Sequence, residues 1–308
     1  MLFYAETPFK FAFSKEKKVG AETPLRAQEG HNIRKDQNKV FSLLGVPFDS
    51  TTTYQPGARF GPMLIRESSY NFEKYNLYLD KKLEAEFYDL GDVQVVPGNF
   101  KKTCQQVQFS IEEILDQGCV PIVIGGDHSI SYPVTRALDI GEASVVHFDA
   151  HTDLRDDYAG ERYSHGTVLR RISELNPQNI IQIGIRSSSQ EEVQFAREEG
   201  LVQFTARDVK NNLDKVVDHL VSLEGPLYVT VDMDVLDPCY APSVGTPAPG
   251  GLNPIELETL IFSLKNKDFI GLDVMEVSSS SVGDITSINA AKVLLDFLFL
   301  QDTPGITI

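Results

Sequence analysis

The sequence predicts an α/β fold in which one open, mostly parallel sheet is covered by helices. From residue 40 onward, short apolar runs alternate with longer amphipathic stretches. Continuous apolar runs are typical of parallel strands, because helices in the crossover connections bury both faces of such a sheet. The chain has 308 residues, of which 42% are hydrophobic, so it is long enough to form a large domain of this kind.

Seven apolar runs are the expected strands, and amphipathic segments of helical length lie between them. We place the runs near residues 120, 145 and 230 at the centre of the sheet. The strands are expected at 40–46, 85–90, 120–126, 143–148, 180–185, 226–233 and 269–275. Helices are expected at 104–117, 190–199, 213–223 and 254–264.

The first 39 residues differ from the rest of the chain. They are charged, with the run "KEKK" at 15–18, and show no clear periodicity. We therefore interpret residues 1–39 as an N-terminal arm or a set of added elements, and residues 40–308 as one domain.

Composition and charge narrow the class of protein. The chain holds 28 Lys and Arg against 44 Asp and Glu, a net charge of −16, which argues against nucleic-acid binding and favours cationic small molecules and metals. Three scattered cysteines without a CxxC pair fit a reducing compartment. Because no apolar run reaches about 18 residues and the opening segment does not resemble a signal peptide, we expect no membrane span and a cytoplasmic location.

Acidic and histidine side chains follow four of the expected strands. In an open α/β sheet, functional groups gather beyond the carboxyl ends of the strands, so these side chains should meet at one rim. Within "DAHTD" the spacing i, i+2, i+4 would place all three charged side chains on one face of extended backbone. The set is His128, Asp149, His151, Asp153, Asp232, Asp234 and Glu276.

A metal centre explains this convergence better than a structural role. A single Asp after a strand is more often a helix N-cap, and Asp127 and Asp237 fit such a supporting role. Five carboxylates and two histidines at one rim would instead repel one another unless a cation neutralised them. Oxygen ligands with some imidazole and no thiolate suit Mn²⁺, and so many carboxylates can hold two ions. Two such ions can activate a water as a nucleophile, which predicts a binuclear hydrolase.

Four motifs, in this order, resemble those of the ureohydrolase family of arginases, agmatinases, formimidoylglutamases and guanidino-acid hydrolases. They are "GGDHS" (125–129), "DAHTD" (149–153), "SHGT" (164–167) and "DMDVLDP" (232–238). The resemblance covers roughly residues 40–300. It implies a three-layer αβα sandwich, two Mn²⁺ ions per subunit, hydrolysis of a small cationic guanidino substrate and a homo-oligomer, either a trimer or a hexamer.

The resemblance also implies a role for each residue of the motifs. One ion would be held by His128 and Asp153, the other by His151 and Asp234, with Asp149 and Asp232 bridging the two.

Three residues would carry the chemistry beside the ions. Asp153 would hydrogen-bond the attacking hydroxide, and Glu276 would hold the guanidinium in line. His165, in "SHGT", would carry protons, since an ordinary histidine pKa near 6.5 suits that task. A loop histidine bonded to the backbone is the alternative for His165.

The substrate is expected to be agmatine, with putrescine and urea as products. The loop "LRDDYAGERYSHGT" (154–167) and the segment "YQPGARFGPMLIR" (54–66) resemble the agmatinase versions of these regions. Asp156, Asp157 and Glu161 should repel a substrate carboxylate. One departure is the run Val277–Ser281 after Glu276, where the family usually shows a proline and an aspartate. Arginine, 4-guanidinobutyrate and formimidoylglutamate remain alternative substrates.

Two alternatives come from other classes of function. A two-metal phosphoesterase would need a basic clamp for phosphate, and only Arg155 and Arg162 are candidates. A non-catalytic metal-binding relative should have lost a ligand, and none is missing.

Overall fold

The computed structural model describes residues 4–5, 7–15 and 39–301. Their main feature is a nine-stranded sheet with the order β1-β5-β2-β6-β11-β10-β7-β8-β9. All neighbours pair in parallel except β1, which is antiparallel to β5. The strands are β1 (Tyr4–Ala5), β2 (Val40–Val46), β5 (Glu86–Val93), β6 (Cys119–Gly125), β7 (Ser144–Phe148), β8 (Asn179–Ile185), β9 (Val202–Thr205), β10 (Pro226–Asp232) and β11 (Asp268–Met275). A separate hairpin joins β3 (Tyr75–Asn76) to β4 (Lys81–Lys82).

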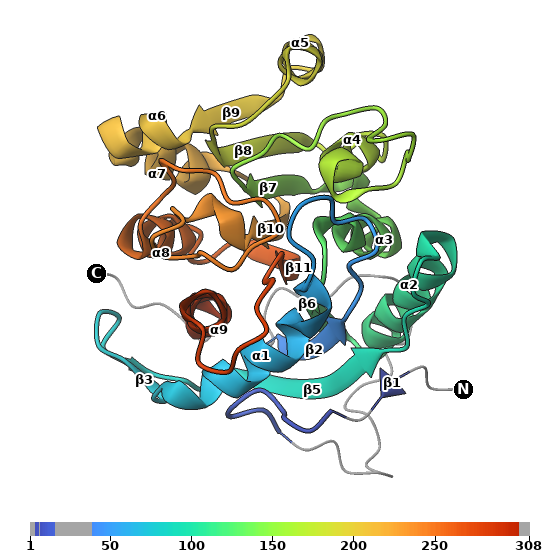
Figure 1. The fold of residues 1–308 in the computed structure, drawn as a ribbon. Helices are drawn as coiled ribbons and strands as arrows, with labels where there is room; N and C mark the ends of the chain where they lie inside the picture. The colour runs from blue at the N-terminus through green and yellow to red at the C-terminus, as the bar shows by residue number, and fades with distance from the viewer. Residues whose placement is uncertain (1–3, 6, 16–38, 302–308) are drawn as a thin grey trace.

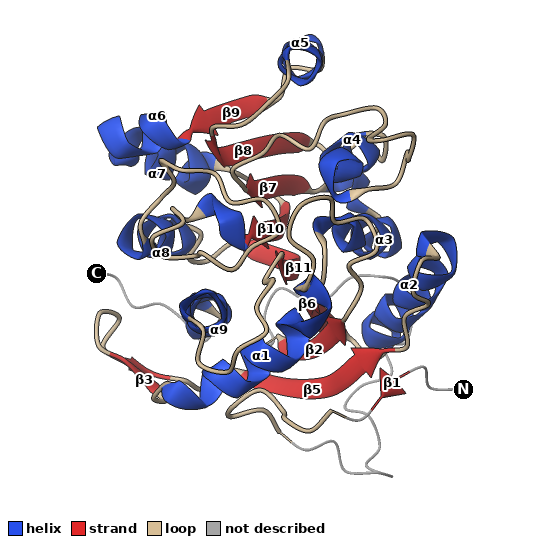
Figure 2. Cartoon of the chain, viewed as in Figure 1, coloured by secondary structure: helices blue, strands red, loops and turns tan. Residues whose placement is uncertain are grey.

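Helices cover both faces of the sheet, which gives the three layers αβα (Figures 1 and 2). A separate hydrophobic core lies on each face, because the strands between them are apolar on both sides. One face carries α1 (Gly61–Ser68), α6 (Ala206–Asn211), α7 (Leu213–Ser222), α8 (Pro254–Ser263) and α9 (Ile285–Leu300). The other carries α2 (Phe100–Asp116), α3 (Ser131–Leu138), α4 (Val168–Ser173) and α5 (Gln190–Glu198).

The expected fold class is confirmed, with one correction to the order of the strands. Each of the seven expected strands and four expected helices has a counterpart whose ends lie within a few residues of the predicted ones. The strand at the centre, however, is β11, which lies between β6 and β10. Apolar runs of similar length do not reveal their order in a sheet, so the run 269–275 gave no sign of its central place.

The described part of the N-terminal segment belongs to the sheet and its core. β1 extends the sheet beyond β5, and Phe11 is buried in the core. The backbone N–H of Phe11 donates to Asp89 Oδ2 at 2.7 Å, and Asp89 is held in turn by the buried guanidinium of Arg66 at 2.8 Å. β1 and Phe11 thus join this segment to the sheet and its core, and residues 16–38 lie outside the described part of the chain.

No helix in the described ranges is long and apolar enough to cross a membrane.

Candidate metal centre

Four neighbouring strands bring the predicted site residues to one edge of the sheet. The strands β6, β11, β10 and β7 are consecutive in the sheet and parallel, so their carboxyl ends lie side by side (Figure 1). The loop after each of them carries part of the set. Residues more than 140 positions apart in the chain thus become neighbours, as His128 and Glu276 show with a hydrogen bond of 2.8 Å.

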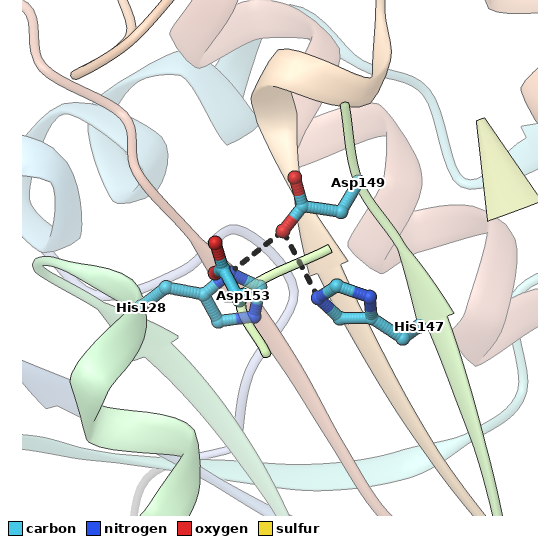
Figure 3. A group of neighbouring side chains, drawn as sticks. All are labelled: His128, His147, Asp149 and Asp153. Atoms are coloured by element: carbon cyan, nitrogen blue, oxygen red, sulfur yellow. Dashed lines mark ion pairs between the residues drawn. The ribbon is translucent and has the colours of Figure 1, made fainter. Parts of the chain in front are cut away.

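The first group of side chains surrounds the imidazole of His128. Its Nδ1 lies 3.1 Å from Asp149 Oδ2, 3.2 Å from Asp232 Oδ2 and 3.6 Å from Asp153 Oδ2. Figure 3 shows that His128, from the loop after β6, points toward Asp149 and Asp153, which both belong to the loop after β7, with His147 on the other side of Asp149. These four residues can each offer one atom to a common ion.

A second group shares Asp149 with the first. His151 Nδ1 lies 2.9 Å from Asp234 Oδ2 and 3.5 Å from Asp149 Oδ1. Asp149, His151 and Asp234 can therefore also converge on one ion. The structure brings all six predicted metal ligands together, and Asp149 faces both groups.

The convergence arises from turns and not from the extended backbone that we expected. Asp149 Oδ1 accepts the backbone N–H of His151, and Asp232 Oδ1 accepts that of Asp234 at 2.7 Å, so each motif begins with a side-chain-capped turn. Asp153 then has a left-handed backbone with φ 51°. A short carboxylate can cap the amide two residues ahead, and this local bond replaces the strand geometry.

The buried carboxylates of the site perturb one another's pKa. Burial raises the pKa of Asp153 and of Glu276 well above the ordinary values. The negative charges of Asp149 and Asp232 add to this effect at Asp153, and those of Asp232 and Asp127 add to it at Glu276. For Asp149, burial acts in the same direction but the imidazoles of His147 and His128 outweigh it, so its pKa is lowered. Anionic carboxylates at this density need a compensating positive charge.

The donor atoms present fit a metal ion. His128 Nε2 lies 2.8 Å from Thr230 Oγ1, whose hydroxyl is in turn hydrogen-bonded to Asp273. The His128 Nε2 proton therefore points to Thr230, and Nδ1 faces carboxylates. Burial lowers the pKa of His128, but the charges of Asp149 and Asp232 outweigh it and raise this pKa well above the ordinary value, so Nδ1 needs a positive charge beside it, either a proton or a metal ion. Within the described ranges, His128 Nδ1 and Asp149 Oδ2 are buried without a hydrogen bond of ordinary geometry. A lone pair that faces anionic oxygens is favourable only when a cation lies between them.

Glu276 lies at the edge of the ligand groups and is rigidly held. It has a left-handed backbone with φ 67°, its backbone N–H donates to Gly126 O at 2.9 Å, and its Oε1 accepts the backbone N–H of His128 at 2.8 Å. A Cβ at Gly245 would lie 2.5 Å from Glu276 Oε2, so only glycine leaves this carboxylate its place.

His165 lies apart from the ligand groups, against the segment that follows β2. Its ring contacts Thr51 Oγ1 at 3.4 Å, Thr53 Oγ1 at 3.4 Å and Ser164 Oγ at 3.2 Å, and Tyr158 packs edge-on against it. Burial lowers its pKa to about 4, with the nearby His151 and His128 adding to the effect. The pKa of His165 thus lies below the ordinary histidine value near 6.5, and the imidazole is uncharged at neutral pH.

The loop between the ligands and His165 is less acidic in effect than its composition suggests. Asp156 binds Arg171 at 2.8 Å and Arg162 at 3.2 Å, so its charge is balanced. Arg155 stacks on the Tyr158 ring at 5.1 Å and lies 3.7 Å from Glu192 Oε2.

These pairings change two expectations. The loop repels a substrate carboxylate less than the sequence implied, because Asp156 is neutralised. Arg155 and Arg162 both have carboxylate partners, so the two candidates for a phosphate clamp are already engaged. The arrangement disfavours a phosphoesterase.

The sequence did not lead us to His147 or Thr230. It did lead us to expect a supporting role, such as that of a helix cap, for Asp127 and Asp237. His147 continues the alternation of "HFDAHTD" two residues before Asp149, and that spacing was the available signal. Thr230 carried no signal, because a threonine in an apolar strand is common. Asp127 accepts the backbone N–H of Thr51 at 2.9 Å, and Asp237 accepts that of Gly250 at 2.7 Å.

Comparisons with known proteins identify the family of the chain. The model of the arginase family matches residues 39–300. The chain is 44% identical to N(1)-aminopropylagmatine ureohydrolase of Thermococcus kodakarensis over 82% of this chain and 88% of that protein. It is 43% identical to agmatinase of Pyrococcus horikoshii over 82% and 89%.

Solved structures give the same result for the fold. Agmatine ureohydrolase of Thermoplasma volcanium superposes with a TM-score of 0.78 at 33% identity, and the match covers 90% of this chain and 93% of that one. The family model and both relatives extend over most of the chain. The protein is a member of the arginase family.

Proposed function

We propose that the protein is a two-manganese hydrolase that converts agmatine and water into putrescine and urea. The observation that carries the proposal is the pair of ligand groups that share Asp149 at the ends of β6, β7 and β10. In this proposal His128 and Asp153 would hold one ion, His151 and Asp234 would hold the other, and Asp149 and Asp232 would serve both. When bound, the ions would supply the positive charge that lowers the pKa of a water toward neutrality.

The protein's own side chains then position the substrate. Glu276 is buried and fixed by the amide of His128, so its carboxylate can hold a guanidinium in one orientation. Asp153 lies 3.6 Å from His128 and can accept a hydrogen bond from the nucleophile. His165 begins as a neutral imidazole, which does not oppose a cationic substrate, and it can take up a proton and return it to the departing amine.

Agmatine is the proposed substrate because an agmatinase is among the similar relatives and because the site is rich in carboxylates. A second candidate is N(1)-aminopropylagmatine, the substrate that the name of the Thermococcus relative gives. The two compounds share the guanidino end and differ in the tail. Ser278 Oγ donates to Gln55 O at 3.3 Å, so the serine run lies beside the segment that contacts His165.

The test is a comparison of kcat/KM for agmatine, N(1)-aminopropylagmatine, arginine and 4-guanidinobutyrate at one Mn²⁺ concentration, with urea as the measured product. Metal analysis of the purified protein accompanies it. We expect kcat/KM for one of the two amine-tailed compounds to exceed the values for arginine and for 4-guanidinobutyrate by at least about tenfold. Repulsion and unpaired charge act against these two compounds because each bears a carboxylate. Equal or better turnover of either carboxylate contradicts the assignment, and full activity after removal of metal contradicts the binuclear site.

We also propose that residues 40–308 form the catalytic domain, with residues 1–39 as an arm or added elements, that the protein acts in the cytoplasm and that it forms a homo-oligomer. Fractionation of cells and light scattering test the last two statements independently of the chemistry.

A further inference from the structure

His147 is a buried histidine beside the proposed metal centre whose role the mechanism does not use. It lies on β7, and its Nε2 is 2.9 Å from Asp149 Oδ2 (Figure 3). Its other ring nitrogen, Nδ1, is 3.2 Å from Gln182 Nε2 on the neighbouring strand β8. The position is compatible with two roles, a seventh metal ligand or a hydrogen-bond donor to Asp149.

Gln182 decides between these roles, because its amide has one orientation. Its Nε2 donates to the backbone carbonyl of Thr152 at 2.9 Å, and a carbonyl can only accept. Its Oε1 accepts from Gln203 Nε2 at 2.7 Å. The amide nitrogen therefore faces His147 Nδ1.

The tautomer of His147 follows from this orientation. An amide N–H that points at Nδ1 requires a lone pair there, so the proton of the neutral ring is on Nε2. A metal ligand would need its lone pair on Nε2, and Nδ1–H would then oppose the N–H of Gln182. The nitrogen that faces Asp149 is thus a donor.

We propose that His147 is a positioning residue, which donates from Nε2–H to the shared carboxylate Asp149 and is set in that tautomer by Gln182. The proposal rests on the proposed metal centre. In this structure the angle of the contact departs from a linear hydrogen bond, although the distance is suitable. Orienting bonds of this kind to a metal ligand typically change metal affinity by about 10- to 100-fold.

Two amide substitutions at residue 147 form a matched pair. In His147→Gln the amide group can occupy the place of Nε2 and still donate to Asp149, whereas in His147→Asn it reaches only the place of Nδ1. We expect the Asn variant to bind Mn²⁺ about 10- to 100-fold more weakly than the natural protein and the Gln variant to bind it within a few-fold. Both should hold the same number of ions as the natural protein at saturating Mn²⁺.

The measurement is a titration of the chelator-treated protein with Mn²⁺, followed by metal analysis at saturation. An Asn variant that binds like the natural protein overturns the proposal, and so does a Gln variant that lacks one ion at saturation, because that is the behaviour of a lost ligand. Failure of the natural protein to bind Mn²⁺ would refute the proposed metal centre instead.

A third variant tests the role of Gln182 and serves if residue 147 does not tolerate substitution. Gln182→Met removes the amide that fixes the tautomer and keeps the length of the side chain. We expect weaker Mn²⁺ binding, with no further loss when it is combined with His147→Asn, since Gln182 acts through His147. Unchanged affinity in Gln182→Met, or additive losses in the double variant, overturns the coupling.

Discussion

At the scale of single residues, the proposed bridging carboxylates should be the most sensitive positions. We predict that Asp149→Ala or Asp232→Ala abolishes turnover, because each removes an oxygen that both ions would share. Urea release and metal content, measured on the same preparations, check this. Exposed Asp218 on α7 provides the control, since Asp218→Ala should leave both unchanged. Substantial activity in either bridging variant contradicts the shared-ligand assignment.

His165 should affect the reaction and not the metal. We predict that His165→Ala lowers kcat by about 10²- to 10⁴-fold, the usual contribution of general acid–base catalysis, with metal content unchanged. The contacts of the ring with Thr51, Thr53 and Ser164 support a place beside the ligands and not among them. Loss of manganese from this variant would instead make His165 a ligand.

The site residues could be predicted because strand ends and acid spacing mark them in the sequence, but their geometry could not. The turn at Asp149 and the left-handed backbone of Asp153 depend on hydrogen bonds that no periodicity reveals. The lowered pKa of His165 depends on burial by segments far away in the chain, which the motif itself does not reveal. The donor role of His147 depends on an amide 35 positions later.

At the scale of elements, the buried apolar strands were predictable and the irregular ones were not. β9 is short and half-buried, so Val202–Thr205 lacks a clear apolar run. α9 is buried along nearly its whole length, and a helix that is apolar on all sides shows no amphipathic period. The place of β11 at the centre depends on the connections between strands, which an individual run does not encode.

One buried ion cluster ties α1 to the edge of the sheet. Arg66 on α1 binds Asp89 at 2.8 Å, Asp92 at 2.6 Å and the carbonyl of Gly91 at 2.9 Å, and its side chain is fully buried. We predict that Arg66→Met lowers the free energy of unfolding by about 3–5 kcal/mol, because it leaves a buried carboxylate without its partner. Denaturant unfolding at neutral pH measures the change.

Arg59 provides the matched control for this prediction. It also binds a buried carboxylate, Asp49, at 2.8 Å, but its own side chain is 53% exposed. Arg59→Met should lower the free energy of unfolding by about 1 kcal/mol or less, since solvent screens the pair and backbone amides still bind Asp49. Equal losses for the two variants would show that burial of the arginine is not the cause.

At the scale of the whole molecule, assembly is the untested expectation. We predict a trimer or a hexamer at working concentration, as the resemblance to ureohydrolases implies. The hairpin between β3 and β4 carries Leu77 and Tyr78 at 78% and 79% exposure, so it offers apolar surface at its tip. Light scattering measures the mass, and a monomer would remove this prediction without affecting the chemistry.

The left-handed backbone conformations of Asp153 and Glu276 position two carboxylates of the site but lower the stability of the fold. Such conformations cost non-glycine residues roughly 1–2 kcal/mol each, so the molecule tolerates local strain where it needs the carboxylates. In chelator, Glu276→Gly should therefore be more stable than Glu276→Ala by about 1 kcal/mol, the reverse of the usual order, as thermal unfolding can measure. If alanine is the more stable, the strain is absent. If the glycine variant is the more stable, the strain is present at residue 276. The chain could then gain stability by losing the Glu276 carboxylate and with it the proposed function, a trade-off that selection for activity must continually oppose.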